Sequence, residues 1–176
     1  MRNGYTRHLV LAGLLIALNI IFVRLLAFKV MVGGTTTLRL SFGTIPVMFA
    51  GLLLGPWWGA AVGAMGDLVG FALNPGGAFF PGFTLTAALT GFIPGVLLHR
   101  NYQRGMVTVV QLLAVVALSE LVTVLLNTYW LTFIIGKGFM VLLPMRAAAR
   151  AVTIPVYTLV LQALRRIVPA GQAVGQ

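Results

Sequence analysis

The chain has 176 residues, of which 60% are hydrophobic and only 8% are charged. Because about a quarter of the residues in a soluble domain are charged, this composition predicts an integral membrane protein, and the length allows a single bundle over residues 1–176. Cysteine is absent, which excludes disulfides and thiolate metal sites. The net charge of +10 is spread over short loops, so it does not indicate a nucleic-acid partner.

The first apolar stretch covers about residues 8–28, close to the roughly 20 residues that cross a bilayer. It is too long for a typical signal peptide, so we expect a retained transmembrane helix. Gly13 and Ala17 form a small-xxx-small pair with Ala12 beside them, which lets another helix approach closely. The pair predicts either packing within the bundle or an interface with a separate protein. Arg24 lies near the end of this stretch.

A polar connection of residues 29–42 follows, and its alternating segment 35–40 predicts a short extended piece. The next apolar helix, about residues 43–54, is short for a membrane span. A glycine-rich helix, about residues 57–73, has two GxxxG spacings and contains Asp67, one of only two acidic residues in the chain. Placing a carboxylate of an apolar helix in lipid costs free energy, so we expect Asp67 to have a hydrogen-bonding or ionic partner or a functional role.

Three further helices are predicted after a loop of Pro, Gly and Phe residues, at about residues 83–98, 106–133 and 144–167. Glu120 lies near the middle of the second of them, and we expect it to be a structural hydrogen-bonding residue near Asn19. The sequence therefore predicts an all-α membrane protein with six transmembrane helices. Basic residues are more numerous in the connections on the side of the termini, which favours both termini in the cytoplasm.

A polar layer is predicted near the external helix ends. Arg24, Asp67, Asn127, Arg146 and Arg150 come from four helices and fall within roughly 9 Å of those ends at a rise of 1.5 Å per residue. The arginines could instead extend to the lipid headgroups, and Asp67 could pair with Arg24 or Arg150 to hold the bundle together. The surplus of guanidinium groups favours an anionic ligand, since arginine binds carboxylates through a bidentate fork.

Phe79, Phe80 and Phe83 lie at and beside the Pro/Gly loop, next to the predicted polar layer. They are either anchors at the membrane interface or an aromatic cover over a flat ligand. No nucleophile–base pair or metal-ligand set is visible, so we do not expect an enzyme. We also see no internal inverted repeat, which argues against a self-sufficient secondary transporter or channel.

Several segments resemble the S-components of energy-coupling factor (ECF) vitamin transporters. These are the small residues of the first helix and the pattern Gly-Pro-x-x-Gly…Gly-x-x-x-Asp-x-x-Gly at residues 55–70. Residues 38–46 and 79–85 look like the folate-specific branch of that group. The resemblance extends over nearly the whole chain and implies the six-helix S-component fold.

The resemblance implies a subunit that captures a vitamin outside the plasma membrane of a prokaryote and needs no cofactor. It would then dock on a transmembrane coupling protein with two ATPase subunits, through Ala12, Gly13 and Ala17. The external loops at 29–42, 74–82 and 134–143 would gate the pocket. An S-component for another vitamin or precursor is the alternative within the family, and a stand-alone transporter or channel is the alternative outside it.

Folate, with a flat pterin and a glutamate tail of two carboxylates, fits the polar layer. A pterin presents adjacent N–H donors that a carboxylate can accept as a pair, so we expect Asp67 or Asn127 to bind the pterin edge. The three phenylalanines would enclose the rings. We expect Arg39, Arg146 and Arg150 to attract or clamp the glutamate carboxylates, with Arg24 in the same layer.

Overall fold

The computed structural model of the protein describes residues 2–25, 27–32, 35–73, 79–135 and 139–168. Over these residues the chain forms six helices and a two-stranded antiparallel sheet. In chain order the elements are α1 (Arg2–Leu25), β1 (Ala27–Val32), β2 (Thr35–Ser41), α2 (Thr44–Leu54), α3 (Pro56–Leu73), α4 (Pro81–Gln103), α5 (Val109–Ile135) and α6 (Phe139–Ile167).

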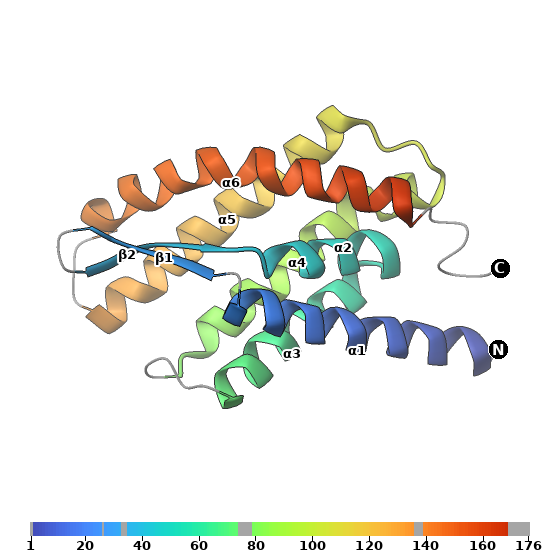
Figure 1. Ribbon diagram of the computed structural model, residues 1–176, viewed down its shortest axis with the longest axis horizontal. Coiled ribbons are helices and arrows are strands. Elements are labelled where there is room, and N and C mark those ends of the chain that lie inside the picture. The colour runs from blue at the N-terminus through green and yellow to red at the C-terminus, as the bar shows by residue number, and fades with distance from the viewer. Residues whose placement is uncertain (1, 26, 33–34, 74–78, 136–138, 169–176) are drawn as a thin grey trace.

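The helices run side by side along the long axis of the molecule (Figure 1). α1 begins and α6 finishes at one end of this bundle, which we call the terminal end. The β1–β2 hairpin extends from the bundle toward the opposite end, which we call the hairpin end. α4 packs against α2, α3 and α5, while α1 packs against α2 and α3 and α6 packs against α5 and β2.

The hairpin adds a two-stranded sheet to the predicted helical bundle and shortens the first helix. α1 ends at Leu25 rather than near residue 28, because Ala27–Val32 already belongs to β1. The extended segment predicted at 35–40 is confirmed as β2, where three consecutive β-branched threonines favour a strand. The register places Lys29 opposite Arg39, so two cationic residues share one cross-strand position.

Glycines allow α2, α3 and α4 to touch backbone to backbone. A Cβ added at Gly59 of α3 would lie 2.5 Å from the carbonyl oxygen of Gly91 in α4 and 2.6 Å from Cα of Gly51 in α2. A Cβ added at Gly95 would lie 2.5 Å from Cα of Pro56. Only residues without a side chain permit this spacing, so the predicted close approach of the glycine-rich helix is confirmed.

The apolar core surrounds α2, in which every residue from Ile45 to Leu54 is buried. Leu15 of α1, Leu112 and Val116 of α5 and Leu161 of α6 complete the core nearer the terminal end. α2 has only 11 residues and is therefore about 16 Å long. It occupies part of the bundle's length, and the hairpin precedes it on the side of the hairpin end.

Four helices are long and apolar enough to cross a membrane. They are the segments Tyr5–Val23, Pro81–Gln103, Val109–Ile134 and Arg146–Ile167. α2 is apolar but shorter, and α3 contains Asp67 and several glycines. The predicted number of six helices agrees with the described residues, whereas six membrane crossings stay a prediction.

Candidate functional site

Polar residues line the contact between α5 and α6 toward the hairpin end. Glu120 and Asn127 are seven residues apart on α5 and therefore lie on the same face, two turns from each other. Arg146 and Arg150 are one turn apart on α6. Nη1 of Arg150 donates a hydrogen bond to Oε2 of Glu120, and these groups form the one salt bridge found within the described residues.

This ion pair corrects two predictions. Glu120 does not pair with Asn19, whose Nδ2 donates instead to the carbonyl oxygen of Gly43 at 2.7 Å. Arg150 lies deeper than predicted, because α6 begins at Phe139 rather than at Pro144. From that start, Arg150 is roughly 16 Å into the helix at 1.5 Å per residue, close enough to reach Glu120.

The pair is buried unevenly. The side chain of Glu120 is 0% exposed, whereas that of Arg150 is 26% exposed. Oε1 of Glu120 has no hydrogen-bond partner among the described residues. A charged group in an apolar bundle depends on its partners, so a half-satisfied carboxylate at this depth needs an explanation.

Other buried polar atoms of the same two helices also lack partners within the described part of the chain. They are Oδ1 of Asn127 and Oγ1 of Thr128 on α5, and Oγ1 of Thr153 and Oε1 of Gln162 on α6. Most buried polar atoms in folded proteins have a partner, which is supplied by protein, water or a ligand. Buried polar groups on α5 and α6 are therefore available to bind a polar ligand.

Asp67 is engaged on the other side of the bundle. Its Oδ2 accepts a hydrogen bond of 2.7 Å from Oγ1 of Thr84, which joins α3 to α4. A pairing of Asp67 with Arg150 is not observed, since Arg150 binds Glu120. The side chains of Arg24 and Arg39 lie outside the part that the structure describes.

Aromatic rings gather where α4 begins and α5 approaches its end. The centroid of Phe80 lies 6.1 Å from that of Phe83 and 5.5 Å from that of Trp130. Nε1 of Trp130 donates to Oγ1 of Thr86 at 3.2 Å, which fixes the indole against α4. We call Phe80, Phe83 and Trp130 the aromatic cluster.

Phe79 does not join the aromatic cluster. It is 46% exposed, and its ring pairs with Phe71 of α3 at 5.3 Å. Trp130, which belongs to the aromatic cluster, was absent from the predicted site. Its spacing from Asn127, three residues along the same helix, could have indicated it.

The small residues of α1 divide between two faces. Gly13 and Ala17 are exposed, and a Cβ added at Gly13 would meet no atom within 4 Å. Ala12 is only 5% exposed and packs in the core. The predicted docking surface therefore reduces to Gly13 and Ala17, with Ala12 behind it. Within the described residues, no group of three or more His, Asp or Glu side chains is placed to hold a metal ion.

The comparisons with known proteins give results that are consistent with one another. Residues 7–165 match the family described as "ECF transporter, substrate-specific component". A folate transporter FolT of Clostridium novyi (strain NT) is 36% identical over 147 residues, which cover 84% of this chain and 81% of the relative. A folate transporter FolT of Leuconostoc mesenteroides is 34% identical over 88 residues, covering 50% of this chain and 44% of the relative.

A solved structure gives the same fold. The crystal structure of FolT bound with folic acid matches with a TM-score of 0.75 and 29% identity, covering 88% of this chain and 91% of the matched one. The family is one of transport components and not of enzymes, as the sequence predicts. The apolar helices agree with a protein of the membrane. On the match over residues 7–165, the chain belongs to the family of substrate-specific components of ECF transporters.

Proposed function

We propose that this protein is the substrate-capturing subunit of an ECF importer and that its substrate is folate or a reduced folate. The relative that is 36% identical over most of both chains is named a folate transporter, and this identity supports the choice of substrate. The polar α5–α6 contact, with its two arginines and unpartnered acceptors, supports the location of the site. Folate is an anion with a polar aromatic head and suits this chemistry.

The proposed topology has six membrane crossings in a single unit over residues 1–176. Both termini would face the cytoplasm of a prokaryotic cell, and the hairpin end would face the exterior. The positions of the basic residues support this orientation, since Arg100, Arg104, Arg165 and Arg166 all lie at the terminal end of their helices. Folate would enter from the hairpin end.

The proposed ligand contacts come from α5, α6 and the aromatic cluster. Asn127 and Arg146 lie about 12 and 10 Å from the hairpin-end termini of their helices at 1.5 Å per residue, so they would be met before Arg150. The aromatic cluster would cover the rings of the ligand, with Phe79 at its edge. Arg24, Arg39 and Asp67 stay proposed members of the site.

The hairpin supports an anionic ligand independently of the helices. Its register pairs Lys29 with Arg39, and two basic residues at paired positions suit an anionic ligand. The carboxylates of a folate glutamate tail would supply that anion at the hairpin end.

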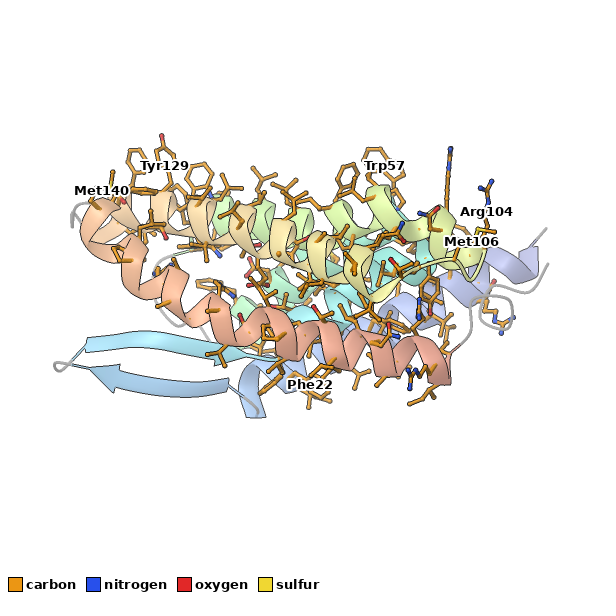
Figure 2. The ribbon with its side chains drawn as sticks, turned by 90° about the horizontal axis from the view of Figure 1, so that it is seen from above. Phe22, Trp57, Arg104, Met106, Tyr129 and Met140 are labelled. Carbon is orange, nitrogen blue, oxygen red and sulfur yellow. The ribbon has the colours of Figure 1, made fainter. Side chains whose placement is uncertain are left out.

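Isothermal titration of the purified protein tests this function. We expect folate to bind tightly and pteroate, which lacks the glutamate, to bind more weakly. Arg146→Gln should lower the affinity for folate by roughly tenfold or more, since a hydrogen bond to a charged group contributes about 1.5–3 kcal/mol. The affinity for pteroate should change less. Arg104→Gln makes the same change of charge at an exposed position of the opposite end and should change neither affinity (Figure 2).

Failure of folate to bind the wild-type protein would disprove the proposed substrate and leave another vitamin or precursor as the candidate. Mass spectrometry of the small molecule retained after detergent extraction would then identify it. Uptake of folate by vesicles that contain this subunit alone, without a coupling protein and ATPases, would favour a stand-alone transporter instead. We expect uptake only when the complete module and ATP are present.

A further inference from the structure

The ion pair between Glu120 and Arg150 is only half complete. One guanidinium nitrogen, Nη1, donates to one carboxylate oxygen, Oε2. The second oxygen, Oε1, is buried and has no partner among the described residues. A structural pair of arginine and glutamate gains most when it is forked, with two parallel N–H···O bonds. Here the single bond leaves one carboxylate oxygen without a partner in the described part of the chain, next to the guanidinium group.

The immediate neighbours on α5 do not complete the pair. Oγ of Ser119 donates to the carbonyl oxygen of Val115 in its own helix, and Oγ1 of Thr123 donates to that of Ser119. The only other acidic residue in the chain, Asp67, accepts from Thr84. Thr153 lies three residues beyond Arg150 on α6, and its own buried hydroxyl oxygen is also unpartnered in the described part. The unused groups therefore suit a molecule that enters from the partly exposed side of Arg150.

The complementary molecule has a fixed pattern. An arginine donor beside a carboxylate acceptor matches a planar edge that shows a carbonyl oxygen next to adjacent N–H groups. The pyrimidinone edge of a pterin has this pattern, with its 4-oxo group, its ring N–H at position 3 and its 2-amino group. We infer that Glu120 and Arg150 together bind this edge, with Arg150 donating to the 4-oxo oxygen and Glu120 accepting from the two N–H groups.

This inference rests on the proposed function and sets the orientation of the ligand. Glu120 lies seven residues, or about 10 Å along the helix axis, deeper than Asn127. The pterin would therefore enter first and lie deepest, while the benzoyl part would lie level with Asn127. The glutamate tail would stay nearest the hairpin end, and Arg146, one turn closer to that end than Arg150, would extend its side chain toward the tail.

The test pairs a change in the protein with a change in the ligand. The first measurement compares folate with 2-desamino-2-methylfolate, which lacks the 2-amino donor, on the wild-type protein by isothermal titration. We expect the analogue to bind about 10- to 100-fold more weakly, since the lost bond is made to a charged group. Glu120→Gln should weaken the binding of folate by a similar factor or more, and it should weaken the binding of the analogue clearly less. The reason is that the analogue has already lost the 2-amino contact with Glu120 and keeps only the contact through the N–H at position 3.

Ser119→Ala is the matched control for Glu120→Gln. Ser119 is the adjacent residue, is equally buried, and bonds only its own helix, so its loss should leave both affinities unchanged. Size-exclusion chromatography checks that each variant folds. If Glu120→Gln does not fold, the comparison of the two ligands on the wild-type protein decides the matter alone.

Three results would overturn the inference. Binding of the analogue to the wild-type protein within threefold of folate would show that the 2-amino group is not bound, and the proposed function would stand. If Glu120→Gln lowers the affinity for both ligands equally, Glu120 only orients Arg150 and does not bind the 2-amino group. No binding of folate to the wild-type protein would remove the proposed function and the inference with it.

Discussion

At the scale of single residues, the absence of a side chain at Gly59 determines how closely three helices approach. A methyl group there would press on the carbonyl oxygen of Gly91 and on Cα of Gly51, which are backbone atoms and cannot rotate away. Gly70 lies three turns further along the same helix, and a Cβ added there would meet no atom within 4 Å. The two glycines therefore form a matched pair for substitution.

We expect Gly59→Ala to lower the free energy of unfolding by about 1–3 kcal/mol, because overpacking outweighs the roughly 1 kcal/mol that alanine gains over glycine in a helix. Gly70→Ala should leave the stability unchanged or raise it by up to about 1 kcal/mol. Thermal unfolding in detergent, followed by circular dichroism, measures both. Equal stability of the two variants would contradict the close packing of α2, α3 and α4.

Trp130 provides a spectroscopic test of the aromatic cluster. The chain has three tryptophans, and Trp57 and Trp58 lie at the start of α3, toward the terminal end. An aromatic ligand beneath the cluster should quench the indole of Trp130 most strongly, since it would be nearest. We expect folate to quench the intrinsic fluorescence, with most of the quench lost in Trp130→Phe.

The control for this experiment is Trp57→Phe. Trp57 is 77% exposed and far from Trp130 along the bundle, as the labels in Figure 2 indicate for Trp57 and Tyr129. The quench should be retained when Trp57 is replaced. A quench that persists in full in Trp130→Phe would place the ligand away from the aromatic cluster.

At the scale of elements, the exposed face of α1 is the proposed contact with the coupling protein. Gly13 and Ala17 present a surface without large side chains, which allows close approach of another helix. We expect Ala17→Trp to abolish co-purification with the coupling module and ATP-dependent uptake, while titration with folate stays at the wild-type affinity. Leu121→Trp, on the exposed side of α5, is the control and should assemble normally.

Full assembly of Ala17→Trp with the module would show that this face of α1 is not the docking surface. Loss of folate binding in the same variant would show that the substitution disturbs the bundle rather than an interface.

The helices were largely predictable because the length and apolar composition of each stretch decide whether it can cross a membrane. The positions of the helix ends were less predictable. The sequence predicts that the last helix begins near Pro144, whereas α6 begins at Phe139 and contains Pro144. That shift of five residues moves Arg150 about 7.5 Å deeper and explains why its pairing with Glu120 was missed.

Side-chain partners were harder to predict than elements. The sequence indicated that Asp67 needed a partner, yet it could not indicate that Thr84, and not an arginine, would supply the hydrogen bond. The sequence predicts only one extended segment of the hairpin, because periodicity does not show which segments pair with each other. Trp130 was overlooked because its role depends on the packing of α4 against α5.

At the scale of the whole molecule, the absence of cysteine makes the proposed topology directly testable. Met106 and Met140 are 67% and 78% exposed and lie at opposite ends of the bundle (Figure 2). We expect a membrane-impermeant maleimide, added to intact cells, to label Met140→Cys and not Met106→Cys. Permeabilised cells should allow labelling of both variants.

The parental chain, which has no thiol, is the blank for this measurement. Labelling of Met106→Cys in intact cells, with Met140→Cys protected, would reverse the orientation. Labelling of both in intact cells would contradict six crossings between two aqueous sides.

The glycine contacts of α2, α3 and α4 have a consequence for protein engineering. In these contacts the backbone atoms of the three helices touch each other. Most substitutions of these glycines should therefore prevent folding, whichever ligand the protein binds. The facing stretches of α5 and α6 near the hairpin touch through side chains and tolerate exchange more readily. A library of variants that changes only these stretches of α5 and α6 should keep the fold of the protein. Its members could then be selected for binding to other flat, charged ligands.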